Sequence, residues 1–494
     1  MDGNSSPLKK TLKNESDKIQ TETKVSKNRR SKSTSTPGGK TLDFDGMIEV
    51  RQISEPLPTE PPLYQKKEHL TPVATPAPMV SGLNAQLRKD QWGTDSFGLG
   101  NFMYQSKAKN SNIIQHYITS PGDISLLPLE EALQIIEKFG LTTAKLHLIF
   151  AAHAMRQEKP WESKFTLSAA DIINELGWDK RSDINKFQKF NEVAKGAFAL
   201  GCLTIQATWV EGRGKKGVEC SVQTSRMWET IVDVRGGQLN LEGKIDEPND
   251  VYITVRPGLW TYAFLNKAGA EAKKALYQFS YLARDILKIN PHHDELALRL
   301  GLHLTVESRF HTSGTYQVQS LLEAVLPTTV IKEAKENRDK AYKLTNRWNH
   351  ALEVLMGLKR AFQIEFDAET YPNELQPSCS ARKPKGYFEK LLAAQITIHP
   401  PAPIPELLEA KTVPYLLLPK SELTNQEVSS TLSNSTEITG EQVRTFRQEK
   451  GWSQVKLAGW LGVTQAFISY IEKGDRPLSK DLEAKLKKLL DTHK

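Results

Sequence analysis

The sequence has little of what disulfide-linked, zinc-bound or membrane proteins require. It holds three cysteines, Cys202, Cys220 and Cys379, and no two of them have a paired spacing, which argues against a disulfide framework or a thiolate zinc site. No apolar run approaches about 18 residues, the length that a transmembrane helix needs, and the N-terminus lacks the apolar segment of a signal peptide. We therefore expect a soluble, cytoplasmic protein with no contact to a membrane.

Motifs for catalysis are also lacking. The chain has no phosphate-loop pattern, so intrinsic ATPase activity is not expected. A rolling-circle nickase would need a His-hydrophobe-His pair, and neither His147 nor His303 has a second histidine two residues away. We interpret His292 and His293 as an ordinary polar helix start and not as metal ligands. The sequence predicts a non-enzymatic protein with no cofactor and no metal.

Positive charge is concentrated at the N-terminus. The net charge is +8 over 494 residues, and residues 1–40 alone hold ten Lys or Arg against four Asp or Glu. Residues 56–78 add seven prolines with little apolar periodicity. We predict that residues 1–110 form a disordered basic, proline-rich tail. One interpretation is a solvated leader. The other is a non-specific phosphate-binding arm with the cations Lys27, Arg29, Arg30 and Lys32.

Residues 120–235 have the element order of a winged helix. Helices are expected over 129–139, 142–155, 169–176 and 182–200, and strands over 164–167, 203–209 and 218–224. Such a domain lays its last helix in the major groove and touches phosphates with the hairpin that follows. The candidate DNA-binding residues are Lys186 and Lys189 on that helix, and Arg213, Lys215 and Lys216 at the hairpin tip. The alternative is a generic helical domain with a solvated hairpin.

Residues 250–400 repeat this order less clearly. Strands are expected over 251–255, 362–366 and 395–398, and helices over 273–288, 294–310 and 315–325, with a charged stretch over 331–360. We interpret the region as a second winged helix, followed by a flexible linker over 401–436. The fold class expected for the chain is mainly α with small β wings. It comprises a disordered tail, two tandem winged helices and a C-terminal all-α helix-turn-helix domain over 437–494.

The C-terminal segment has the clearest pattern. Two short helices are expected on either side of Gly462, with a first helix over 439–450 and a closing amphipathic helix over 478–490. Ser453 and Thr464 stand one residue ahead of the two short helices, where a hydroxyl can cap free backbone N–H groups. The apolar positions that pack these helices are Leu457, Ala458, Leu461, Val463, Ile468 and Ile471.

Residues 438–490 resemble the lambda-repressor-like helix-turn-helix family, also called the xenobiotic-response-element type. The pattern runs Arg447-x-x-x-Gly451-Trp-Ser-Gln454, then Leu-Ala-x-x-Leu-Gly-Val-Thr-Gln465, then Ile-Ser-x-x-Glu472. The resemblance implies that Arg447 and Glu472 pair inside the fold, and that Gln454 donates to a DNA phosphate and braces Gln465. It also implies that the third helix reads base edges, since a glutamine can bind adenine with two hydrogen bonds.

The candidate DNA-binding residues of this domain are Gln454, Thr464, Gln465, Ala466, Phe467, Ser469 and Tyr470. Phe467 is expected to touch a thymine methyl group or the backbone. Tyr470 is larger than the polar residues common at its position in the family. The alternative is that these side chains cover a helix used for protein contact.

The middle of the chain resembles plasmid replication initiators built from tandem winged helices. The segments that carry this resemblance are Leu141-Thr-Thr-Ala-Lys-Leu-His-Leu-Ile-Phe, Phe165-Thr-Leu-Ser-Ala-Ala-Asp, Leu296-Ala-Leu-Arg-Leu-Gly-Leu-His-Leu and Tyr316-Gln-Val-Gln-Ser-Leu-Leu-Glu. The resemblance implies binding of repeated origin sites, a homodimer in exchange with the monomer, and host replication proteins as partners. A C-terminal helix-turn-helix domain of this kind differs from the usual C-terminus of proteins in that family.

The main hypothesis is a sequence-specific double-stranded DNA-binding protein that acts as a plasmid-type replication initiator, associated with the nucleoid or with a plasmid. One alternative is a transcriptional regulator that uses the same readers on an operator. Another is a scaffold of a mobile-element complex, in which the DNA contacts serve only to tether the protein.

Overall fold

The computed structural model describes two compact units, Met1–Pro414 and Tyr415–Lys494, which are treated separately. The described residues are 49–51, 57–64, 68–106, 109–120, 122–212, 217–235, 248–307, 314–377, 379, 381–405, 407, 443, 444, 447, 452–461, 463, 465–472 and 482. Nearly all of the linker predicted over 401–436 therefore lies outside the described residues.

The first unit begins with elements that the sequence analysis assigned to the tail. They are β1 (Glu49–Arg51), β2 (Leu70–Ala74), α1 (Ala77–Leu87), η2 (Lys89–Gln91), β3 (Gly93–Thr94), β4 (Gly100–Gln105) and β5 (Ile113–Tyr117). Val73 and Met79 are fully buried, so the predicted tail boundary at residue 110 is wrong. Prolines misled the prediction. Pro76 is the N-cap of α1 and Pro78 lies in its first turn, where a missing N–H removes no helical hydrogen bond.

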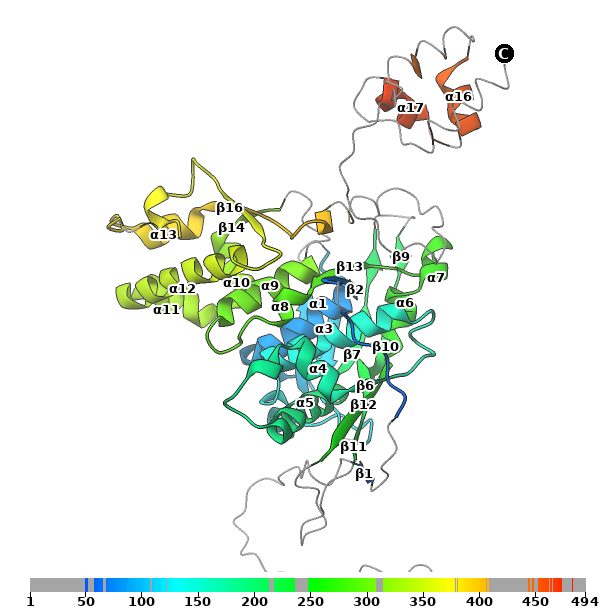
Figure 1. Ribbon diagram of the computed structural model, residues 1–494, viewed down its shortest axis with the longest axis vertical. Helices are drawn as coiled ribbons and strands as arrows, with labels where there is room; N and C mark the ends of the chain where they lie inside the picture. The colour runs from blue at the N-terminus through cyan, green and yellow to red at the C-terminus, as the bar shows by residue number, and fades with distance from the viewer. Residues whose placement is uncertain are drawn as a thin grey trace, which may run out of the picture. The chain divides into compact units, whose positions relative to one another are not determined.

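A four-stranded sheet in the order β1-β11-β12-β6 packs against α4 and α5 (Figure 1). Its strands β6, β12 and β11 are antiparallel neighbours, with Leu167 opposite Ile253. The elements of this region are α2 (Leu129–Ile136), α3 (Leu141–Arg156), β6 (Phe165–Ser168), α4 (Ala169–Glu175), η3 (Trp178–Lys180), α5 (Lys186–Gly201), β11 (Trp228–Arg235) and β12 (Asp250–Pro257). Residues 251–255, predicted as part of the second winged helix, complete this first sheet instead.

The strands predicted over 203–209 and 218–224 belong to a different sheet, in the order β10-β7-β5-β4-β3. Here β7 (Thr204–Thr208) lies between β5 and β10 (Val222–Arg226). β7 and β10 pair antiparallel with each other, as the predicted hairpin requires. The pairing of β7 with β5 was missed, because the alternation of a strand reports that it has a buried face but not which strand lies next to it. The expected hairpin is formed by β8 (Val210–Glu211) and β9 (Val218–Glu219). Its tip, with Arg213, Lys215 and Lys216, lies outside the described residues.

Residues 258–290 connect the two halves of the first unit. α6 (Trp260–Phe264) and α7 (Lys267–Glu271) precede β13 (Phe279–Ala283) and α8 (Arg284–Leu287). The helix predicted over 273–288 is wrong, because β13 pairs antiparallel with β2, about 200 residues earlier in the chain. Alternate residues Ser280 and Leu282 are fully buried in that pairing, as expected of a strand with one covered face.

The second half contains a smaller sheet and five α-helices among its described residues. Its three-stranded sheet has the order β14-β16-β15, and the strand β14 replaces the first turn of the helix predicted over 315–325. The predictions of helix over 294–310 and of strands over 362–366 and 395–398 are close to the observed bounds. The elements are α9 (Glu295–Glu307), β14 (Thr315–Gln317), α10 (Val318–Val325), α11 (Thr328–Glu336), α12 (Arg338–Met356), β15 (Gln363–Phe366), η5 (Asn373–Leu375), α13 (Tyr387–Ala393) and β16 (Gln395–His399).

One continuous apolar core runs through both halves of the first unit, with Trp228, Trp260 and Trp348 fully buried. The second unit has a separate core around α16 (Gln454–Leu461) and α17 (Gln465–Glu472). Its buried residues are Val443, Trp452, Leu457, Ala458, Leu461, Ile468 and Ile471. In neither unit is any helix of the described part long and apolar enough to cross a membrane.

Candidate nucleic-acid interface

The helix-turn-helix of the second unit is fixed by its apolar core and by a cap. Leu457, Leu461 and Ile468 are buried where α16 and α17 meet. The Ser453 hydroxyl accepts a hydrogen bond from Lys456 N–H at 3.1 Å, so the predicted cap is present at the start of α16. Thr464, the corresponding residue before α17, lies outside the described residues.

Arg447 and Glu472 form a two-point ion pair across this domain. Arg447 Nε donates to Glu472 Oε1 at 2.6 Å and its Nη2 donates to Oε2 at 3.0 Å. A third nitrogen, Nη1, donates to the carbonyl of Trp452 at 2.8 Å. Burial acts to raise the pKa of Glu472, but the hydrogen bonds from Arg447 and Gln454 outweigh it and lower that pKa. The carboxylate is therefore held in its charged form.

Two glutamines extend this pair to the surface. Gln454 Nε2 donates to Glu472 Oε2 at 2.9 Å, and Gln465 Nε2 donates to Gln454 Oε1 at 3.1 Å. Gln465 is exposed at the first residue of α17. Each amide is oriented by its neighbour, and among the residues that the structure describes none pairs with the Gln465 carbonyl oxygen or with its second N–H hydrogen.

The remaining residues predicted to face DNA are only partly described. Ser469 is half-buried on α17. The backbones of Ala466, Phe467 and Tyr470 lie in the same helix, while their side chains are outside the described residues. Base reading by these residues stays a prediction.

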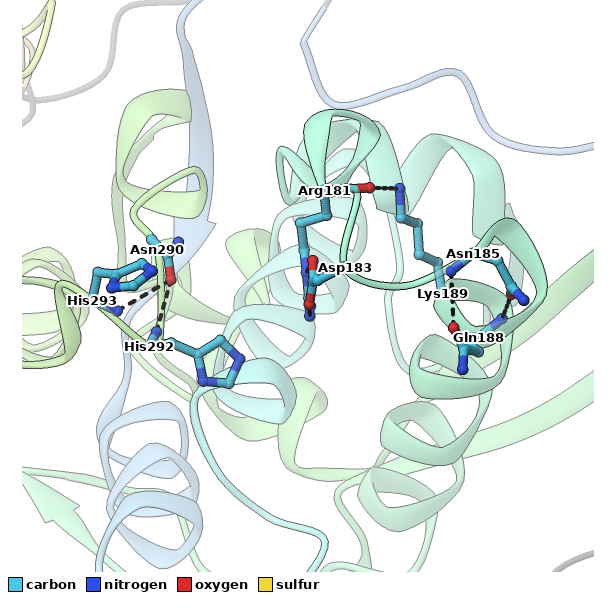
Figure 2. A network of polar contacts seen from close by, with 8 residues as sticks. All are labelled: Arg181, Asp183, Asn185, Gln188, Lys189, Asn290, His292 and His293. Atoms are coloured by element: carbon cyan, nitrogen blue, oxygen red, sulfur yellow. Dashed lines mark hydrogen bonds and ion pairs between the residues drawn. The ribbon is translucent and has the colours of Figure 1, made fainter.

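The two lysines at the start of α5 that were predicted to contact DNA differ in their exposure. Lys186 is exposed, and its amine lies 3.3 Å from the carbonyl of Asn249. Lys189 is buried, and Figure 2 shows its amine directed at the carbonyl of Arg181, to which it donates at 2.6 Å. Lys189 therefore holds the loop ahead of α5 and is not available to a phosphate. The prediction for Lys189 is wrong, because helical spacing did not show which lysine faces inward.

A face of α12 that the sequence analysis did not single out combines amide, aromatic and basic side chains. Lys383 Nζ donates to Asn346 Oδ1 at 2.7 Å and lies 4.4 Å from the ring centre of Tyr342. Tyr342 is 54% exposed, unusually open for so large an apolar ring. The charged stretch over 331–360 pointed to this helix, but its exposed side could not be defined without the partner strands.

Comparison with known proteins identifies a helix-turn-helix domain in the second unit. Residues 439–493 match the family model of a helix-turn-helix domain. The chain is also similar to a crystal structure of selenomethionine derivatives of domain 2 and domain 3 of RctB, at 12% identity, over 65% of this chain and 99% of that chain, with a TM-score of 0.33. A likeness at that score does not establish a shared fold. No curated protein gives a significant match.

The second unit is thus a helix-turn-helix domain, a class of domain that binds DNA. Its exposed glutamine, Gln465, is the first residue of α17.

Proposed function

We propose that this protein binds double-stranded DNA sequence-specifically and acts as a plasmid-type replication initiator, without enzymatic activity or cofactor of its own. The observation that carries the DNA-binding part is the chain of contacts from Arg447 through Glu472 and Gln454 to Gln465. It holds an amide at the exposed start of α17 in one orientation. Such preorganisation lowers the entropy lost when a side chain binds a base edge.

The tandem winged helices of the proposal rest on a repeated topology. In the first half the elements α3, β6, α4, α5, β11 and β12, with β7 to β10 inserted between α5 and β11, give the order β6-β12-β11, to which β1 is added at the edge. In the second half α9, β14, α10, α12, β15 and β16, with α11 inserted before α12 and α13 before β16, give β14-β16-β15. Each has a short strand between its first two helices and places the last strand in the middle. On this assignment α5 and α12 are the groove-facing helices.

The two wings differ in charge. The segment between β11 and β12 covers 236–249, with one lysine and three acidic residues, and its charge is poorly suited to contact phosphates. The segment between β15 and β16 covers 367–394 and has four Lys or Arg and four acidic residues, with all four cations within 382–390. We infer that the second half makes the stronger DNA contact of the two. We also propose phosphate contacts at the hairpin of β8 and β9, from Arg213, Lys215 and Lys216.

Gln465→Ala tests whether this residue contacts a base. Binding to the sequence that the full chain selects from a random duplex pool should weaken by about 1–3 kcal/mol, roughly 5- to 150-fold, because two hydrogen bonds to one base are lost. Binding to an unrelated duplex should change little. Competition titrations with both duplexes measure the two effects, and an equal loss in both would remove Gln465 from base reading.

The initiator role needs a cellular test. A plasmid that carries this gene and its flanking DNA should replicate in a host that cannot otherwise maintain it. The proposed homodimer and host replication proteins as partners belong to this role. Failure to replicate together with strong repression from a flanking promoter would favour a transcriptional regulator. Failure of both, with DNA binding intact, would favour a DNA-tethered scaffold of a mobile-element complex.

A further inference from the structure

An open cavity of about 620 Å³ lies where the two halves of the first unit meet. The end of α1, the start of α3 and the start of α9 form its walls. Its polar lining includes Gln86, Lys89, Thr142, His292 and Arg299. No function described above uses these residues.

Several hydrogen-bond donors converge on this cavity. α3 begins at Leu141 and is 16 residues long, and its N-cap is Gly140, which has no side chain to accept from the first N–H groups of the helix. Leu141 and Thr142, which carry two of those N–H groups, line the cavity. Burial lowers the pKa of Lys89, Glu137 acts against that change, and the like charge of Arg299 lowers the pKa further. The helix N-terminus and the Lys89 amine, which also donates to the carbonyl of Glu137 at 3.0 Å, therefore favour an anion here, whereas the charge of Arg299 is neutralised by its pair with Glu295.

The acidic residues of the cavity do not cancel this preference. Glu295 is already engaged, because its Oε1 accepts from Arg299 Nε at 2.8 Å and its Oε2 from Arg347 Nη2 at 3.3 Å. Asp90 is exposed at the rim in η2.

Gln86 gives independent evidence of a ligand. The residue is fully buried in the wall of the cavity, and its Nε2 donates to the carbonyl of Gly82 at 3.0 Å. Its Oε1 is also buried, and none of the residues that the structure describes donates to it. A buried amide oxygen needs a donor. A water that donates to both Gln86 Oε1 and a bound phosphate oxygen would satisfy both groups.

The cavity lies between the two helices assigned to the DNA grooves. On one side Glu295 and the adjacent Asp294 pair with Arg347 and His350 of α12. On the other side His292 lies near the loop ahead of α5, where Arg181 and Asp183 form an ion pair (Figure 2).

We propose that the cavity binds one backbone phosphate of a DNA duplex as the duplex passes from α12 to α5. The N–H groups of Leu141 and Thr142 and the amine of Lys89 contact the phosphate oxygens, and His292 lies at the rim. This inference rests on the proposed function. It adds a contact outside the three helices that face the grooves, and this contact is independent of base sequence.

Lys89→Gln in the full chain tests the contact. Affinity should fall about five- to tenfold for every duplex, and the slope of log affinity against log salt should become less steep by about one, the value for one phosphate. Lys274→Gln is the matched control, since Lys274 is also exposed but follows α7, far from α12 in Figure 1. Because the effect does not depend on sequence, a random 30-base-pair duplex serves as the probe even if no preferred site exists.

Thr142→Asp separates binding from folding. A carboxylate in the first turn of α3 stabilises the helix, so thermal stability should stay equal or rise. The same charge repels a phosphate, so DNA affinity should fall at least as much as in Lys89→Gln. A merely structural cavity would give the first effect without the second.

Two results would overturn the inference. One is an unchanged salt slope in Lys89→Gln. The other is a rise in the melting temperature of the free protein with millimolar ATP or pyrophosphate that Lys89→Gln abolishes, with DNA affinity unaltered, which would make the cavity a site for a phosphorylated metabolite. Loss of all sequence preference in wild type with the Lys89 effect intact would instead refute the proposed sequence-specific function.

Discussion

At the scale of single residues, the pair of Arg447 and Glu472 links the fold of the C-terminal unit to its binding surface. The side chains are 13% and 4% exposed, so neither charge is well solvated. Removing one partner of such a pair leaves the other buried without compensation, which is costlier than removing both.

Arg447→Ala should therefore destabilise the second unit by about 3–5 kcal/mol. The reason is that Glu472 keeps its charge in a buried place and Gln454 loses its anchor. Hydrogen exchange of the α17 amides in the full chain measures the effect. Arg447→Met combined with Glu472→Leu should recover much of the loss, and a double variant as unstable as Arg447→Ala would contradict the account.

Three buried histidines of the first unit make its stability depend on pH. Burial lowers the pKa of His116 to about 4 and the pKa values of His147 and His153 to about 3. Each ring is neutral in the fold, whereas in the unfolded chain it binds a proton near pH 6.5. The stabilisation is fully present above pH 6.5 and is lost as the pH falls toward 4 and 3.

We expect the denaturation midpoint of the first unit to fall steadily between pH 6.5 and pH 4. His116→Gln should reduce this dependence, because an amide does not take up a proton in this pH range. The amide can still form the hydrogen bonds of His116 to Thr204 O and Ser81 Oγ. Urea titrations over this pH range provide the measurement. A midpoint that stays constant to pH 4 would contradict the assigned neutral state.

At the scale of elements, α12 is the main addition to what the sequence could reveal. Residues 331–360 were described from the sequence only as a charged stretch, and the exposed face of the helix there depends on β15, β16 and α13, which come later in the chain. Alternation identified the strands at 203–209 and 218–224. It could not show that β7 pairs with β5, because both neighbours would bury Ile205 and Ala207 equally.

Asn346→Ala tests the role of α12. The change removes an exposed amide and the acceptor that holds Lys383. Affinity for the selected duplex should fall about tenfold, the loss expected of one amide contact to a base. Asn373→Ala is the matched control, since Asn373 is also exposed but lies in η5 and accepts from Gln376 Nε2. Equal affinities for the two variants would exclude α12 from the interface.

At the scale of the whole molecule, the features that depend on nearby residues were predictable from the sequence, and those that depend on distant partners were not. The helix-turn-helix was predictable because its buried core residues, cap and ion pair all lie within about 30 consecutive residues, Val443 to Glu472. The N-terminal elements were not, because β2 and β5 are ordered by partners such as β13 and β7 far along the chain. Prolines in that region gave the same signal as a disordered tail.

Two arginines show how the halves of the first unit are joined. Arg88 Nη2 donates to the carbonyls of Glu323 and Ala324, and Arg299 Nη1 donates to those of Leu87 and Val325. The end of α10 is thereby tied to α1 and α9. The proposed groove helices α5 and α12 are parts of one packed unit, which favours a single continuous contact with a duplex.

The most direct test is the ratio of affinities of the full chain for its selected duplex and for an unrelated duplex of equal length, measured by competition at physiological salt. The account predicts a ratio of roughly a thousandfold or more, as is usual for sequence-specific proteins. Equal and weak binding to every duplex, including fragments of its native genome, would contradict it.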